Sequence, residues 1–178
     1  EYETFELLIG TATDAGYPVS VVESPAGETE GASYCTLSAD DTELQYGLDL
    51  IATWNADEEL FTSIGSELFA GLFVEPIATL FRSSLALVRS QNRHLRLRLR
   101  IEPPELHTLP WELLYDPDEK VKLATAADIA LVRHFPQRIP VRPTEVRLPL
   151  RLLVAISMPV NLVALDVERE KAIIQQAL

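Results

Sequence analysis

The thiol and imidazole side chains in this sequence, which could supply a nucleophile and a base, are few and scattered. There is one cysteine, Cys35, and there are three histidines, His94, His107 and His134. A thiol and an imidazole together can act as nucleophile and base. Cys35, however, lies in the segment Ser-Tyr-Cys-Thr-Leu, which is typical of a strand, where a thiol usually serves as a small packing residue. We therefore predict no catalytic residue in this chain.

The sequence also lacks the usual residue patterns of metal and cofactor sites. No two histidines stand at the spacing by which a helix presents metal ligands, so we expect no zinc site. All seven glycines lie at or before Gly71, and none has the spacing of a phosphate-binding loop, which argues against a P-loop or Rossmann nucleotide site. Trp111 could stack on a ligand, but Leu113 and Leu114 beside it favour a core position. The sequence predicts no bound cofactor.

The element around which the chain is organised is residues 95–101, where apolar side chains and arginines alternate strictly. This period of two predicts a strand with one buried face. We expect the arginines on the other face to be solvated, or paired with the acidic half of the chain, rather than to contact nucleic acid. The apolar positions are Leu95, Leu97, Leu99 and Ile101, and the arginines are Arg96, Arg98 and Arg100.

A double proline, Pro103-Pro104, ends this strand, because proline has no amide hydrogen for the ladder. Residues 109–115 then predict a short helix with Thr108 as its N-cap. Three of its side chains recur at helical spacing and should press together onto the strand. They are Trp111, Leu114 and Tyr115.

The segment before residue 95 predicts a layer that covers this strand. Residues 5–9, 17–23 and 32–37 have the alternating or β-branched character of strands, with a turn at 24–28. We expect the first 50 or so residues to form an antiparallel meander with one wet face. Two helices follow, one over 58–72 with Asp57 as N-cap and one from Pro76 to Ser90.

The segment after residue 115 predicts a turn at 116–120, strands at 121–124 and 129–135, and a stiff connector at 136–149, which holds four prolines. Residues 150–157 form an apolar run typical of a strand buried on both faces. We expect this strand to dock beside the 95–101 strand, or to self-associate through its exposed edge. Asp166 should cap a final helix, Val167–Leu178. The prediction is an α/β fold with domains at 1–135 and 150–178.

Composition sets limits on the class of protein. The 178 residues carry a net charge of −12, and residues 1–91 hold 16 acidic residues against only Arg82 and Arg89. A protein that binds duplex nucleic acid normally has a concentrated basic face, which is lacking here. No apolar run reaches 18 residues, so we expect no membrane span. A single cysteine fits a reducing compartment, and we expect the cytoplasm.

Six segments, in order, resemble those of bacterial CHAT-domain proteins, the relatives of caspases and separase. They are SPAGE (residues 24–28), LRLRLRIEPPEL, LPWELLYDP, IALVRHF, LRLLVAIS and LDVEREK. The resemblance covers nearly the whole chain, and LPWELLYDP after a strand and PPEL is its most specific part. It implies a two-part cysteine peptidase, in which a pseudo-protease-like half (residues 1–135) precedes a caspase-like half. Residues 150–178 would be the first strand and helix of that half.

In this family the catalytic histidine lies in a His-Gly motif and the cysteine in a motif such as NACQS, both further downstream. Neither motif occurs here, so the resemblance assigns peptidase activity to no residue of this chain. It implies a structural and regulatory role, bracing the protease half and relaying binding from a neighbouring sensor or repeat module. A second interpretation is a stand-alone acidic protein-interaction module, which would use the β layer or the helix pair.

Overall fold

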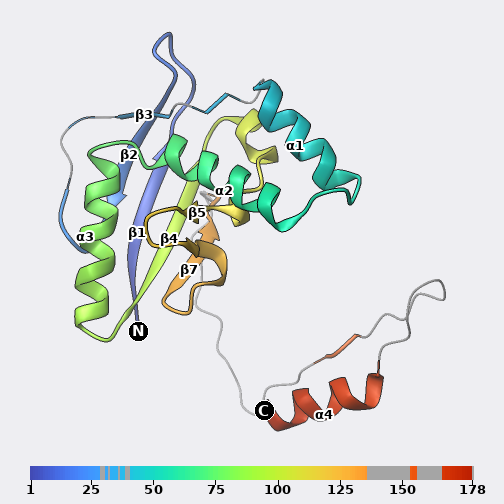
Figure 1. Ribbon diagram of the computed structural model, residues 1–178. Coiled ribbons are helices and arrows are strands. Elements are labelled where there is room, and N and C mark those ends of the chain that lie inside the picture. The colour runs from blue at the N-terminus through green and yellow to red at the C-terminus, as the bar shows by residue number, and fades with distance from the viewer. Residues whose placement is uncertain are drawn as a thin grey trace. The chain divides into compact units, whose positions relative to one another are not determined.

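The fold is built on a five-stranded sheet with the order β3-β2-β1-β4-β7 (Figure 1). The computed structural model describes residues 1–28, 31, 33–35, 37–38, 41–135, 153–155 and 166–177. The strands of this sheet are β1 (Tyr2–Ile9), β2 (Tyr17–Glu23), β3 (Ser33–Cys35), β4 (His94–Ile101) and β7 (Ile129–Arg133). A separate hairpin pairs β5 (Tyr115–Asp116) with β6 (Val121–Lys122). The predicted α/β class is confirmed.

The centre of the sheet joins two strands that are distant in sequence. β1 pairs with β4 in parallel, and β4 pairs with β7 in parallel, whereas β1, β2 and β3 form the predicted antiparallel meander. Phe5 lies opposite Leu97 and Leu7 opposite Leu99, and all four side chains are fully buried. The N-terminal strands are therefore part of the same sheet as β4, and our prediction that they cover it as a separate layer was wrong.

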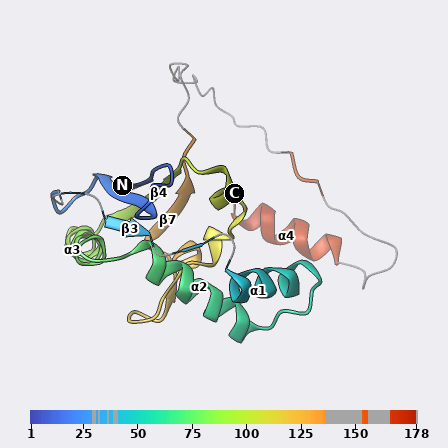
Figure 2. The ribbon, with the colours of Figure 1, turned by 90° about the horizontal axis from the view of Figure 1, so that it is seen from above.

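The described residues form four helices, namely α1 (Thr42–Ala52), α2 (Glu58–Leu72), α3 (Ile77–Ser90) and α4 (Val167–Ala177). α2 and α3 confirm the predicted pair and lie on the same side of the sheet (Figure 2). The Asp57 carboxylate accepts the Leu60 N–H at 2.8 Å, as an N-cap does. α1 lies in a segment that we predicted as β. That prediction was wrong, because Asp41 caps a helix there by accepting two backbone N–H groups.

The predicted helix over 109–115 was wrong, because this segment forms a 3-10 turn, Trp111–Leu113, and then enters β5 at Tyr115. Another 3-10 turn, Pro104–Thr108, precedes it. Thr108 ends the first turn instead of capping a helix, and its hydroxyl donates to the Glu105 carbonyl at 2.9 Å. The predicted helix cannot extend to Tyr115, because Tyr115 and Asp116 pair with Lys122 and Val121 of β6. Trp111 and Leu114 are fully buried, as predicted.

The strand predicted at 121–124 is shorter, because β6 ends at Lys122 and a 3-10 turn, Leu123–Thr125, follows. The turn before it, over 117–120, is present as predicted.

Among the described residues, no single helix has both the length and the apolar composition to cross a membrane. Only α2 and α3, taken together as a pair bent by 105°, meet both criteria.

The chain divides into two units, Glu1–Arg138 and Ile139–Leu178. In the second, α4 begins as predicted, with the Asp166 carboxylate accepting the Arg169 N–H at 3.1 Å. Residues 153–155 are not in a strand, and Leu153 is 93% exposed. The rest of the strand predicted at 150–157, and the connector at 136–149, lie outside the described residues. Docking beside β4 was a wrong prediction in any case, because β1 and β7 occupy both edges of β4.

Candidate functional site

Cys35 is placed where nucleophilic chemistry is not supported. It is buried in β3, and two strands, β2 and β1, separate it from β4. At about 4.8 Å per strand, the three steps from β3 to β4 alone span about 14 Å. Cys35 also lies opposite Tyr17, near the carboxyl end of β1, whereas His94 lies opposite Tyr2 at its amino end, so the two side chains are far beyond hydrogen-bond reach. Burial also raises the pKa of the Cys35 thiol, which disfavours the reactive thiolate. The packing role predicted for this cysteine agrees with its position.

The three histidines take part in packing and backbone contacts. The His94 ring packs on Tyr2 at 5.2 Å between centroids, and the His107 ring stacks on Phe135 at 5.4 Å and 14°. The backbone N–H of His134 donates to the Leu99 carbonyl. Across the part of the chain that the structure describes, no group of three His, Cys, Asp or Glu side chains is placed to hold a metal ion.

The arginines of β4 are engaged with their own sheet. Arg98 pairs with Glu6 of β1 at 3.0 Å, and Arg100 pairs with Glu102 at 3.3 Å. The Arg96 guanidinium lies 5.3 Å from the centroid of the Tyr2 ring, a cation–π distance. The prediction that these arginines pair with the acidic half of the chain is therefore confirmed for Arg98, whereas the partner of Arg100, Glu102, lies outside that half.

The backbone of β7 presents one side to β4 and leaves the other side open. The Asp128 carbonyl accepts from β4 and the His134 N–H donates to β4, both at 2.8 Å. In a parallel ladder, alternate residues direct their backbone groups to the same neighbour. The even-numbered residues from 128 to 134 therefore face β4, whereas Leu131 and Arg133 direct amide and carbonyl groups to the opposite edge. No strand among the described residues pairs with that edge.

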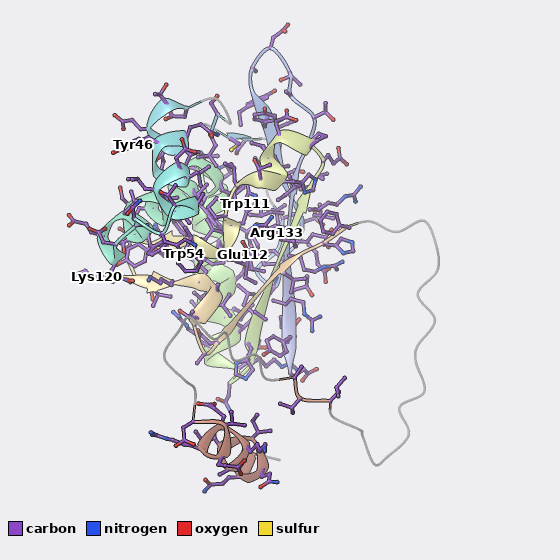
Figure 3. All side chains as sticks on the ribbon, turned by 90° about the vertical axis from the view of Figure 1, so that its right-hand side faces the viewer. Tyr46, Trp54, Trp111, Glu112, Lys120 and Arg133 are labelled. Carbon is purple, nitrogen blue, oxygen red and sulfur yellow. The ribbon has the colours of Figure 1, made fainter. Side chains whose placement is uncertain are left out.

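The carboxyl end of β7 is held by the side chain of Arg133. Its guanidinium donates to the His107 carbonyl (2.9 Å), the Leu109 carbonyl (2.9 Å) and the Glu112 carboxylate (2.5 Å). One arginine thus joins β7 to both 3-10 turns that follow β4 (Figure 3). The sequence offered a signal for this contact, because Arg133 continues the inward positions of Ile129 and Leu131.

The amino end of β7 is held from α3. Arg89 donates to the Asp128 carboxylate at 2.6 Å and to Glu119 at 3.2 Å. Arg82, one helical heptad earlier, pairs with Asp118 in the same turn. Arginine side chains therefore bond to residues at both ends of β7. The open edge of β7 is the candidate functional site.

The Glu112–Arg133 pair predicts a pH-dependent contribution to stability. Burial acts to raise the pKa of Glu112, but the hydrogen bond and charge of Arg133, with a backbone hydrogen bond, hold it below its usual value. A carboxylate with a lowered pKa stabilises the fold above its unfolded-state pKa and loses this contribution as the pH falls through its folded-state pKa. The pair is partly exposed, so we expect at most about 1 kcal/mol.

The measurement is chemical denaturation of the wild type and Glu112→Gln between about pH 3 and pH 7. The difference in unfolding free energy should be present near neutral pH and should shrink below about pH 4. A difference that stays constant over the whole range would contradict this account.

The α1–α2 surface was missed at the level of sequence, because α1 itself was missed. It carries two exposed aromatic residues, Tyr46 and Trp54, which Figure 3 places on the side of the molecule where α1 lies. The signal that would have revealed the helix is the spacing of Leu44, Leu48 and Ile51 after Asp41.

Searches of family models, of curated proteins and of solved structures each find no match to this chain.

Proposed function

We propose that this chain is the non-catalytic, structural and regulatory part of a CHAT-type cysteine peptidase, and that it braces the caspase-like half of its parent. The resemblance of its ordered segments supports the proposal. Two of these segments also contact each other, because Arg133 of IALVRHF donates to Leu109 and Glu112 of LPWELLYDP. The chain itself would supply neither the nucleophile nor the base.

The observation that carries the proposal is the open edge of β7. Edge strands with unpaired amide and carbonyl groups attract further strands, and soluble proteins normally block them with charges, prolines or bulges. The open positions here are Leu131 and Arg133, and the Arg133 guanidinium is turned away from the edge towards the 3-10 turns. The edge is thus left free to receive a strand, which we assign to the caspase-like half of the parent.

The first test is the reading frame that follows the codon for Leu178. The proposal expects a His-Gly motif and, after it, an Asn-Ala-Cys motif, which together supply base and nucleophile. A reading frame that continues with neither motif, or that stops, would overturn the assignment to a peptidase.

The second test is residue-resolved amide hydrogen exchange on β7 in this chain and in the whole parent protein. In this chain the amides of Ala130, Val132 and His134 should be protected and those of Leu131 and Arg133 should exchange fast. In the parent all five should be protected. If Leu131 and Arg133 exchange equally fast in the parent, the edge receives no strand and the bracing role fails. Protection that appears in this chain alone only at high concentration would instead indicate pairing of two copies.

The second candidate function is a stand-alone acidic interaction module, and the exposed aromatic residues Tyr46 of α1 and Trp54 just after it favour it. The reading frame discriminates between the two candidates. In either case we propose a cytoplasmic protein, since its one cysteine is buried and free. We propose neither nucleic acid nor membrane as a partner, because carboxylates already pair with Arg98 and Arg100.

A further inference from the structure

A groove of about 520 Å³ runs between α1 and α2. Its apolar part is formed by Tyr46 from one helix and by Leu60 and Ile64 from the other. The Tyr46 side chain is 66% exposed, so its ring is available to a partner. A groove between two helices has the shape that accepts a third helix, which would lay its apolar side chains along the floor.

The groove is bordered by carboxylates that have no cation. Glu43 and Glu67 line it, and Asp41 caps the start of α1 beside them. None of the ion pairs formed by the described residues involves any of the three. Burial, followed by repulsion from Asp41 and Glu43, raises the pKa of Glu67. These carboxylates therefore repel one another, and a cation placed among them would relieve the repulsion.

Trp54 is an independent sign of a partner at the same helix. α1 ends in a Schellman motif, in which the Asn55 N–H bonds to the Leu50 carbonyl (2.9 Å) and the Trp54 N–H to the Ile51 carbonyl (3.1 Å). Trp54 occupies the left-handed position of this motif, with φ of 59°, where glycine is favoured. Its side chain is 95% exposed. The chain thus bears backbone strain and an exposed indole, and neither contributes to packing within it.

We propose that the α1–α2 groove is a docking site for a basic amphipathic helix of another protein. The apolar face of that helix would pack on Tyr46, Leu60 and Ile64, and its Lys or Arg side chains would pair with Glu43 and Glu67. Trp54 would cover the end of the bound helix, as aromatic anchors do at protein interfaces. The same carboxylates would repel anionic lipid and nucleic acid. This site is separate from the β7 edge, and it does not rest on the proposed function.

The probe is a synthetic helix of about 18 residues, with leucine at positions i, i+3, i+4 and i+7 of each repeat and lysine elsewhere. The matched control peptide replaces every lysine by glutamate. Intrinsic fluorescence reports binding directly, because Trp111 is already fully buried and Trp54 is exposed. The lysine peptide should produce a saturable blue shift that weakens as salt rises from about 0.05 to 0.5 M, whereas the glutamate peptide should produce none.

Variants of the full chain separate docking from folding. Trp54→Gly should weaken binding, measured by calorimetry, by about 30-fold. It should also raise Tm by about 2–4 °C, since glycine relieves the left-handed strain. Glu43→Gln with Glu67→Gln should weaken binding by about tenfold and flatten its salt dependence. Tyr34→Ala, at an exposed aromatic residue of β3, is the control and should bind as the wild type does.

Three results would overturn the proposal. The first is no binding of the lysine peptide, and the second is equal binding of the lysine and glutamate peptides. The third is wild-type affinity in the more stable Trp54→Gly variant, which would show that the indole takes no part. None of these results bears on the reading frame or on amide exchange in β7, so the two proposals fail separately.

Discussion

Replacing Trp111 by alanine should lower the free energy of unfolding by about 3–5 kcal/mol. The indole is fully buried, and its Nε1–H donates to the Leu106 carbonyl at 2.8 Å. The substitution therefore opens a large cavity and leaves a buried carbonyl without its donor. A loss of this size is a large share of the total stability of a typical domain, about 5–15 kcal/mol. Urea denaturation, followed by circular dichroism, measures it.

The chain provides its own control, because it contains one other tryptophan. Trp54→Ala removes the same side chain from a position that is 95% exposed. We expect its free energy of unfolding to stay within about 0.5 kcal/mol of that of the wild type. Similar losses for the two variants would mean that Trp111 is not an anchor of the core, and a ligand-stacking role for it would return.

Replacing Gly65 by alanine should be the second most damaging change, with a net loss of about 2–3 kcal/mol. A Cβ atom at this position would overlap the Leu113 carbonyl oxygen and would lie 2.9 Å from Tyr115 Cβ. α2 would then have to move away from the 3-10 turn and from β5. The gain of about 1 kcal/mol in helix propensity on replacing glycine by alanine offsets only part of this cost.

Gly47→Ala in α1 is the matched control, since it adds the same methyl group to another helix. There the new atom would meet Ile64 Cδ1 at 2.8 Å, the far end of a flexible side chain that can rotate away. We expect the free energy of unfolding to change by about 1 kcal/mol or less, because the gain in helix propensity and the cost of moving the Ile64 side chain nearly cancel. Equal losses at the two glycines would contradict the view that Gly65 is required by a backbone contact.

The elements that the sequence predicted well are those whose signal is local. The strict alternation of apolar residues and arginines over 95–101 predicts the strand β4. The recurrence of apolar residues every four positions after Asp57 predicts the helix α2. The segment 109–115 was misread as a helix, since the helical spacing of its apolar residues does not reveal that Tyr115 pairs with Lys122 of β6. The parallel pairing of β1 with β4 joins residues about 90 positions apart, and no local pattern encodes that register.

The same distinction explains what could be predicted of the sites. That Cys35 lies in a strand could be read from its neighbours, and the structure places it in β3. The hydrogen bonds from Arg133 to the 3-10 turns join residues more than 20 positions apart in the sequence. The proximity of Glu67 to Asp41 and Glu43 depends on how α1 packs on α2. Such contacts are decided by tertiary packing, which periodicity does not report.

The parallel order of β1, β4 and β7 has a mechanical consequence. The chain enters the sheet where the Glu1 carbonyl accepts from the His94 N–H, and leaves it where the His134 N–H donates to the Leu99 carbonyl. These points lie at opposite ends of β4, so tension applied at residues 1 and 135 runs along the strands and shears many hydrogen bonds at once. Tension across the sheet, applied through β3, would instead peel the meander open bond by bond. A pull along the strands is therefore resisted by the hydrogen bonds of the sheet together, whereas a pull across them loads one bond at a time.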